Sequence, residues 1–340
     1  MKIIIDAFGG DNAPKEIVKG AVTSVNLISD VKIALTGKKD VIEKELAEIG
    51  YKGDRIEIID APEVITCEDS PTLAIRQKKN SSLVVGLDTL SADDSYDAFI
   101  SCGSTGAVLA GALFRVGRIP GVLRPALSPM LPNAKGGKTL IIDSGANVDC
   151  KPEYLVQFAV MGSAYLKATY GIDSPRVALM NVGTEDEKGN ELTHTVFEEL
   201  KKMPQINFVG NMEAREMLSG DYDVVVCDGF VGNVALKSTE GAVGFILSAL
   251  KSTIKNGGLM GKLGALLMKK DFKKMALDLD YTQLGGSPFL GVKKLVIKSH
   301  GSSKAKTIYS CVMQAYKLYQ NKTMEKIKES INSLGEDSEK

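Results

Sequence analysis

The first 60 residues alternate short β-branched runs with segments whose apolar side chains recur at helical spacing. Residues 2–5, 32–36 and 56–59 are apolar runs of strand length, and the segments between them follow the period of a helix. A chain that alternates in this order forms a parallel sheet, because each helix returns the chain across the sheet in a right-handed crossover. We therefore predict an α/β fold with a mostly parallel sheet.

The same alternation continues through most of the chain. Further strands are predicted at 97–101, 137–142, 176–180, 206–209 and 223–227, and helices at 72–79, 81–90, 107–114, 191–203, from 152 onward and up to 250. With 340 residues, 44% of them hydrophobic, the chain can build one large domain or two smaller ones. We predict a single α/β/α domain over 1–325, or two intertwined lobes. After Tyr319 the chain is polar, which predicts an exposed, frayed helix and a tail at 326–340.

Composition and charge exclude several classes of protein. Lys+Arg and Asp+Glu both number 42, so no excess of positive charge indicates a nucleic-acid partner. The five cysteines are scattered without a Cys-x-x-Cys pair, which is typical of a reducing cytosol and argues against a disulfide framework or a zinc site. No apolar run approaches the length of a transmembrane helix. We predict a cytoplasmic protein without a metal or other cofactor.

A Gly-Ser-Thr-Gly turn connects one predicted strand to the helix at 107–114. In such a turn, free backbone N–H groups and the positive end of the helix meet at one point, which favours binding of an anion, phosphate above all. We expect the glycines to let the anion approach the backbone closely. The alternative is a structural turn with a hydroxyl as helix cap. The predicted phosphate-binding residues of this turn are Gly103, Ser104, Thr105 and Gly106.

Four other connections resemble one another. Each has Asp or Asn at the carboxyl end of an apolar run, then glycine, then the start of a helix; the four span 6–12, 143–147, 181–184 and 228–233. Taken singly, each Asp or Asn can be a helix cap or part of an Asx-turn. Because the carboxyl ends of parallel strands form the ligand crevice of an open sheet, the set predicts a shared active site. The candidate catalytic residues are Asp143, Asn147, Asn181, Asp228 and Asn233.

Basic side chains near this crevice are candidates for holding an anion. Arginine presents a planar fork of donors to phosphate, although single arginines are also common on protein surfaces. The chain has two histidines, which gives little support to a Ser-His-Asp triad. His194 is expected on the surface, whereas His300 ends a strand and opens the last helix. The basic candidates for phosphate binding are Arg118, Lys237, His300 and Lys304.

Residues 257–280 combine a leucine stripe with the densest group of lysines. In one continuous helix, Lys270 and Lys274 would fall on the apolar face, so the change of phase predicts two short helices with a turn near 269–271. An apolar stripe flanked by lysines predicts contact with a partner or an anionic membrane. A hairpin packed on the core is the alternative. The predicted contact residues are Lys262, Leu263, Leu266, Leu267, Lys269 and Lys270.

These loops resemble those of the bacterial phosphate acyltransferases of phospholipid synthesis. The resemblance covers residues 1–320 and rests on DAFGGD (6–11), GSTGA (103–107), GRI (117–119), RPAL (124–127), GANVD (145–149), NVGTE (181–185), DGF (228–230), GGS (285–287) and HGS (300–302). It implies a three-layer α/β/α fold like that of isocitrate dehydrogenase and phosphotransacetylase. It also implies formation of acyl phosphate from acyl-acyl carrier protein (acyl-ACP) and inorganic phosphate, a homodimer, peripheral membrane contact and a membrane-bound glycerol-3-phosphate acyltransferase as downstream partner.

Such a reaction needs no covalent enzyme intermediate, because a thioester is already activated. The enzyme would hold phosphate in line with the carbonyl and stabilise the oxyanion. Cys102 as an acyl-accepting nucleophile is an alternative, although no histidine is visibly paired with it. Two other functions stay open, a short-chain phosphotransacetylase using acyl-CoA and a non-catalytic, membrane-docked lipid-sensing scaffold. A dinucleotide-dependent dehydrogenase is disfavoured because no Gly-x-Gly-x-x-Gly follows a strand.

Overall fold

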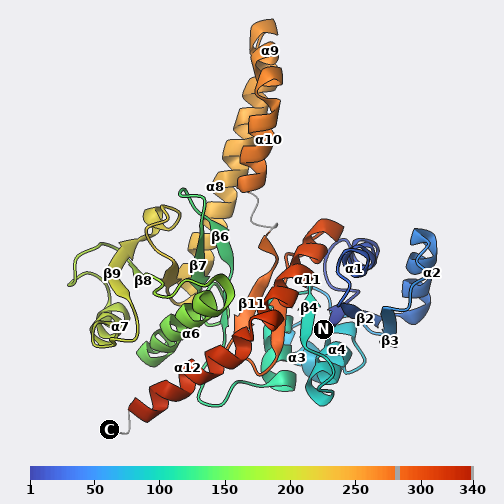
Figure 1. Ribbon diagram of the computed structural model, residues 1–340, viewed down its shortest axis with the longest axis horizontal. Coiled ribbons are helices and arrows are strands. Elements are labelled where there is room, and N and C mark those ends of the chain that lie inside the picture. The colour runs from blue at the N-terminus through green and yellow to red at the C-terminus, as the bar shows by residue number, and fades with distance from the viewer. Residues whose placement is uncertain (280–283, 338–340) are drawn as a thin grey trace.

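Two sheets organise the chain in the computed structural model, which describes residues 1–279 and 284–337 (Figure 1). The first sheet has seven strands in the order β3-β2-β1-β4-β12-β11-β5, and all pairs are parallel except those of β11 with its two neighbours. Its strands are β1 (Lys2–Asp6), β2 (Lys32–Gly37), β3 (Ile56–Asp60), β4 (Ala98–Ser101), β5 (Ala126–Leu127), β11 (Ser287–Leu290) and β12 (Leu295–Lys298).

Helices cover both faces of this sheet, which explains the continuous apolar run of β1. Ile3 and Ile5 are buried in the core shared with α1 and α11, whereas Ile4 is buried in the core under α4 and α5. Successive side chains of a strand alternate between faces, so a strand covered on both sides needs apolar residues throughout. The helices are α1 (Lys15–Leu27), α2 (Lys39–Ile49), α3 (Pro71–Gln77), α4 (Ser82–Ala92), α5 (Thr105–Gly111), its π-helical continuation η1 (Ala112–Val116) and α11 (Ala305–Gln320).

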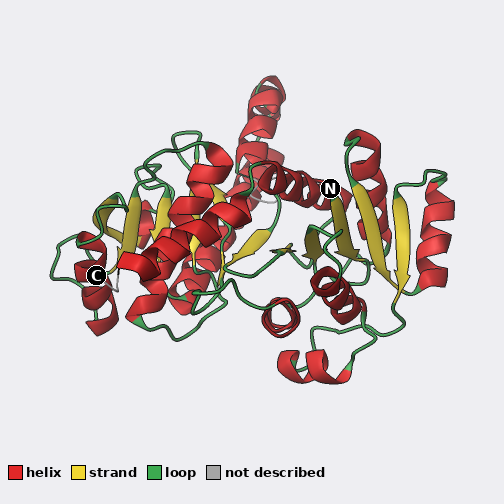
Figure 2. Ribbon diagram, turned by 60° about the horizontal axis from the view of Figure 1, so that its bottom comes forward, coloured by secondary structure: helices red, strands yellow, loops and turns green. Residues whose placement is uncertain are grey.

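The second sheet has five strands in the order β6-β7-β10-β8-β9, of which only β6 runs antiparallel to its neighbour. Helices α6 and α7 cover one face, and the first turns of α8 cover the other. These elements are β6 (Met130–Pro132), β7 (Lys138–Ile142), β8 (Val177–Asn181), β9 (Phe208–Glu213), β10 (Val224–Val226), α6 (Pro152–Tyr170), α7 (Glu191–Lys201), the short helix η2 (Ala214–Glu216) and α8 (Gly229–Asn256). Figure 2 shows the two sheets side by side, each between helices.

The prediction of an exposed, frayed C-terminal helix was wrong. Helix α12 (Thr323–Asp337) packs along α6, and its Ile327 and Ile331 are 0% and 3% exposed. These two isoleucines stand four residues apart and therefore share one helical face. The polar composition of the segment concealed this narrow apolar stripe. The described part of the segment assigned as a tail, up to Asp337, is thus part of the helical layer.

A helical protrusion, formed by the second half of α8 with α9 (Leu259–Leu267) and α10 (Lys269–Asp278), extends from the body (Figure 1). The predicted break into two short helices is confirmed, although it falls at Met268, just before the expected 269–271. Neither α9 nor α10 contains a buried residue, and Leu259 is 85% exposed. The alternative of a hairpin packed on the core is therefore excluded for the described residues. No helix in the described ranges is long and apolar enough to cross a membrane.

Candidate functional site

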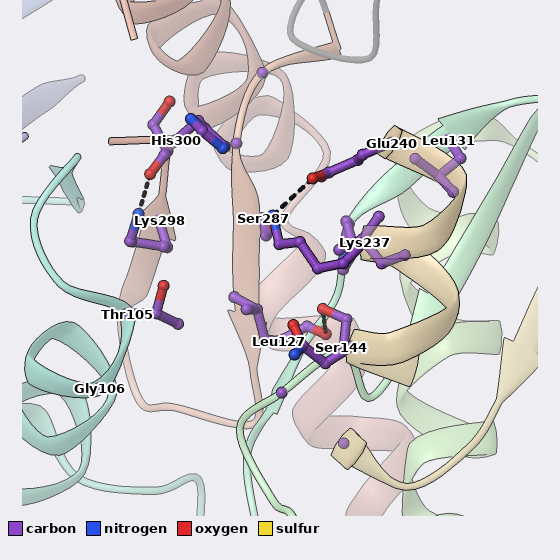
Figure 3. Close-up of a pocket in the computed structure, with 18 of the residues that line it drawn as sticks. Thr105, Gly106, Leu127, Leu131, Ser144, Lys237, Glu240, Ser287, Lys298 and His300 are labelled. Atoms are coloured by element: carbon purple, nitrogen blue, oxygen red, sulfur yellow. Dashed lines mark hydrogen bonds and ion pairs between the residues drawn. The ribbon is translucent and has the colours of Figure 1, made fainter. Parts of the chain in front are cut away.

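A pocket of about 380 Å³ lies between elements of the two sheets. Its walls come from the start of α5, β5, the loop after β7, α8, the segment leading into β11, and the end of β12 (Figure 3). Ligands bind at the carboxyl ends of strands in open α/β sheets, and both β7 and β12 point their carboxyl ends here. The polar side chains that line it include Thr105, Ser144, Asn233, Lys237, Glu240, Lys298 and His300.

Lys298 is a buried cation on the wall of the pocket, and the sequence reasoning did not identify it. It is the last residue of β12 and is 8% exposed; its Nζ donates a hydrogen bond to the carbonyl of Ser299. No carboxylate forms an ion pair with it among the described residues. Burial lowers the pKa of Lys298. A desolvated ammonium without a counter-ion favours the binding of an anion.

The Gly-Ser-Thr-Gly turn contributes to the pocket only through its second half. Thr105 and Gly106 line the pocket at the first turn of α5, where backbone N–H groups have no acceptor within the helix. Gly103 does not line it, and its N–H donates to Ser101 Oγ at 3.0 Å. Ser104 is the N-cap residue, without a side-chain cap bond, and also lies outside the lining. The anion-binding role of the turn stays a prediction, confined to its helical half.

Gly106 has a packing role that the sequence reasoning did not identify, while its role in the approach of an anion stays a prediction. A Cβ at this position would lie 2.8 Å from Cγ of Pro71, on α3. The space that the missing side chain leaves is therefore filled by α3, and a larger residue would push two helices apart. The glycine therefore permits close packing of α5 against α3.

Asp143 is buried at the end of β7 and organises the loop that follows it. Its Oδ1 accepts N–H bonds from Leu127, Gly145 and Ala146, and its Oδ2 accepts the backbone N–H and the side-chain amide of Asn147 at 2.7 and 2.9 Å. Burial raises the pKa of Asp143. The carboxylate itself does not line the pocket, but Ser144 and Gly145 do. Asp143 is thus placed to position the pocket wall, and Asn147 adds a bond to the Pro125 carbonyl.

The remaining polar candidates divide between the pocket and other places. Asn233, on the first turns of α8, lines the pocket. Asp228 caps α8 by accepting the N–H of Val231 at 2.8 Å and stays outside the lining. Asn181 is held by Lys188 and Asn211, also outside. Of the four similar loops, those at 143–147 and 228–233 therefore reach the pocket and that at 181–184 does not.

The first loop, residues 6–12, contributes no residue to the pocket lining but contacts the segment that follows Lys298. Asn12 donates to the carbonyls of Ser302 and Ser303, and the N–H of Asp11 donates to the carbonyl of Gly301 at 2.8 Å. Gly10 has φ +91°, and a Cβ there would lie 2.7 Å from that same carbonyl, so the contact requires glycine. The loop fixes the segment that follows Lys298.

Of the basic candidates for phosphate binding, two line the pocket and two lie elsewhere. Lys237 lines the pocket but forms an ion pair of 2.7 Å with Glu240, so its charge is already compensated. His300 lines it too; burial and the nearby Lys237 lower its pKa, so the ring is neutral at neutral pH. Lys304 is the exposed N-cap residue of α11 and is not part of the lining. Arg118 lies on a different hollow, with Phe114 and Leu123, so the structure does not support its assignment to phosphate in this pocket.

Cys102 is unsuited to act as the acyl-accepting nucleophile. It is 2% exposed, and burial raises the pKa of its thiol to about 11. The thiolate is the nucleophilic form, and this pKa keeps the thiol protonated at neutral pH. Its side chain is also absent from the lining of the pocket.

Whole-chain comparisons place this architecture among known proteins. Residues 1–326 match the family described as fatty acid synthesis protein. The phosphate acyltransferase of Alkaliphilus oremlandii is 49% identical, with 99% of each chain covered. That of Clostridioides difficile is 46% identical over 99% of this chain and 98% of its own. This chain belongs to the phosphate acyltransferases.

Solved structures confirm the predicted three-layer α/β/α fold of this acyltransferase. A phosphotransacetylase from Streptococcus pyogenes superposes with a TM-score of 0.64 at 17% identity, covering 94% of each chain. A 4-hydroxythreonine-4-phosphate dehydrogenase from Klebsiella pneumoniae also matches, with a TM-score of 0.52 at 13% identity, covering 93% of this chain and 98% of its own. The same fold thus carries different chemistries, and the fold alone does not decide the reaction.

Proposed function

We propose that this acyltransferase transfers a long-chain acyl group from acyl-ACP to inorganic phosphate, releasing acyl phosphate and free carrier protein for phospholipid synthesis. The observation that carries the proposal is Lys298, a buried ammonium without a carboxylate partner among the described residues, in a pocket that also contains the first turn of α5. Such a pair of a desolvated cation and open N–H groups suits a phosphate dianion.

In the proposed reaction a phosphate oxygen attacks the thioester carbonyl directly. The new C–O bond forms as the carbonyl electrons move to oxygen, and the tetrahedral intermediate then expels the carrier thiolate, which takes up a proton from water. Lys298 and the N–H groups of Thr105 and Gly106 hold the phosphate, while the side-chain amide of Asn233 stabilises the oxyanion. Asp143 keeps the loop carrying Ser144 in place. No step uses the Cys102 thiol.

Incubation with palmitoyl-ACP, with and without inorganic phosphate, tests the reaction. We expect acyl phosphate and free carrier protein only when phosphate is present, with no acyl-enzyme on mass spectrometry. Transfer from acetyl-CoA but not from palmitoyl-ACP would favour the short-chain phosphotransacetylase instead. Vesicle binding without any turnover would favour the lipid-sensing scaffold.

The pH dependence of phosphate use follows from Lys298. Its folded pKa is lowered, so the ammonium that attracts phosphate is lost at a lower pH than in an exposed lysine. We expect kcat/KM for phosphate to fall as pH rises through this pKa. Bound dianion favours the ammonium, so the alkaline limb of kcat should lie at higher pH than that of kcat/KM. In Lys298→Arg both limbs should flatten, because guanidinium stays charged; an unchanged profile would contradict the assignment.

We extend the proposal to a peripheral position on the cytoplasmic membrane surface, where acyl phosphate would pass to a membrane-bound glycerol-3-phosphate acyltransferase. The protrusion supports this, because Leu259 and Leu267 are 85% and 79% exposed beside Lys262, Lys269 and Lys270. Apolar side chains next to lysines insert into the interface of anionic bilayers. A homodimer completes the proposal, and light scattering should give twice the mass of the chain.

Charge introduced on the protrusion should release the enzyme from membranes. We expect Leu263→Asp with Leu267→Asp to abolish most sedimentation with phosphatidylglycerol vesicles, because each aspartate opposes insertion and repels the anionic surface. Turnover in solution should persist, since neither leucine lines the pocket. Leu27→Asp, at another exposed leucine on α1, serves as the matched control. Vesicle binding that survives in the double variant would show that another surface binds the membrane.

A further inference from the structure

A second hollow, of about 500 Å³, lies outside the pocket. It is lined by Leu113, Phe114, Arg118, Leu123, Arg124 and Tyr154. Phe114 is 58% exposed and Leu123 is 41% exposed. The guanidinium of Arg76, on α3, lies 5.7 Å from the centre of the Phe114 ring and adds a third cation. We call this hollow together with Arg76 the arginine surface.

The three guanidinium groups of the arginine surface carry uncompensated charge. Arg76, Arg118 and Arg124 are exposed, and no carboxylate lies within ion-pair distance of any of them in the described part of the chain. Of the other arginines, three form ion pairs, Arg115 with Asp88, Arg176 with Asp223 and Arg215 with Glu213, whereas Arg55 donates to backbone carbonyls. Three unpaired cations around exposed apolar side chains leave both charge and apolar area available to a partner.

The guanidinium groups are nevertheless held in place. Arg124 stacks on the ring of Tyr154 at 5.8 Å, and Arg118 donates to the carbonyl of Leu123. Arginine on an aromatic face keeps its outer N–H donors free for carboxylates. Ordering these side chains before binding reduces the entropy lost when a partner arrives.

The arginine surface connects to the pocket along one helix. Thr105 and Gly106 begin α5 and line the pocket, whereas Leu113 and Phe114, in the π-helical continuation η1, line the arginine surface. At a rise of 1.5 Å per residue these ends stand about 12 Å apart. A partner docked on the arginine surface therefore needs only a short flexible arm to place a thioester in the pocket.

We propose that the arginine surface docks the acidic protein that carries the acyl chain, with its carboxylates on the three arginines and an apolar side chain between Phe114 and Leu123. This inference rests on the proposed function. A lipid surface fits less well, because α3, which carries Arg76, lies on the opposite side of the body from α9 (Figure 1). A flat membrane at the tip of the protrusion would not reach it.

The test compares a protein-borne donor with a small one. Arg118→Glu with Arg124→Glu should raise KM for palmitoyl-ACP by about 10-fold or more, since close charge pairs at protein interfaces contribute strongly. The phosphate KM and the rate with an uncharged N-acetylcysteamine thioester should stay within about twofold, because neither arginine lines the pocket. Arg215→Glu, at an exposed arginine on η2, is the matched control. It should change neither the KM for palmitoyl-ACP nor the rate with the small thioester. If the double variant does not fold, Arg76→Glu on the exposed face of α3 replaces it.

Each outcome decides the inference. An unchanged KM for palmitoyl-ACP in a folded variant overturns it, as does an equal loss with both donors. Loss of vesicle binding with an unchanged carrier KM assigns the surface to lipid and also overturns it. If the wild type makes no acyl phosphate from palmitoyl-ACP, the proposed function fails, and direct titration of holo-carrier protein then decides the docking. If the carrier protein binds the wild type but not the double variant, docking on the arginine surface is supported. If the carrier protein does not bind the wild type, both the docking and the proposed function are contradicted.

Discussion

Lys298→Met is expected to lower kcat/KM for phosphate by about 100- to 1,000-fold, which is the loss seen when one preorganised electrostatic contact to a reacting group is removed. The ammonium is the one buried cation that lines the pocket among the described residues. Methionine has a similar length and flexibility but cannot bind an anion. Initial rates over a range of phosphate concentrations, at saturating acyl-ACP, measure the effect.

The same variant should not lose stability, which separates a binding role from a structural one. Removing an unpaired buried charge leaves the free energy of unfolding unchanged or raises it, because the desolvation cost of the ammonium disappears. Urea unfolding of Lys298→Met beside the wild type checks this. Normal phosphate saturation in a folded Lys298→Met protein would refute the assignment of phosphate to this pocket.

Asp143→Ala is expected to lower the free energy of unfolding by about 3 kcal/mol or more. The carboxylate accepts five hydrogen bonds, and the alanine variant leaves these buried and partly buried donors without that acceptor. The loop that carries Ser144 and Gly145 would also lose its shape, so the phosphate KM should rise in the protein that remains folded. Urea denaturation and phosphate kinetics on one preparation measure both effects.

Asp143→Asn is the matched control, because it keeps the size of the side chain and one acceptor oxygen. Its loss of stability should be smaller than that of alanine, since Oδ1 alone accepts three of the five bonds. An alanine variant with an unchanged unfolding midpoint would show that water replaces the carboxylate. The positioning role of Asp143 would then have to be abandoned.

Local patterns in the sequence were sufficient for most of the elements. The β-branched run at 2–5 needed cover on both faces, and the structure buries Ile4 on one side and Ile5 on the other. The phase break in the lysine-rich segment located the boundary at Met268 to within a few residues. Both inferences depend on periodicity along a single segment, which neighbouring segments do not alter. The narrow stripe of Ile327 and Ile331 was missed because its flanks are polar.

The membership of the site was decided by the tertiary structure. Strand β12 pairs with β4, nearly 200 residues earlier in the chain, and this pairing brings Lys298 beside the start of α5. No pattern near Lys298 distinguishes a buried ammonium from a surface one, because its burial depends on elements far away in sequence. Arg118 shows the converse, since this residue of the GRI motif (117–119) lines a separate hollow. The sequence thus determined which loops end strands, whereas the order of strands in the sheets determined which of those loops meet.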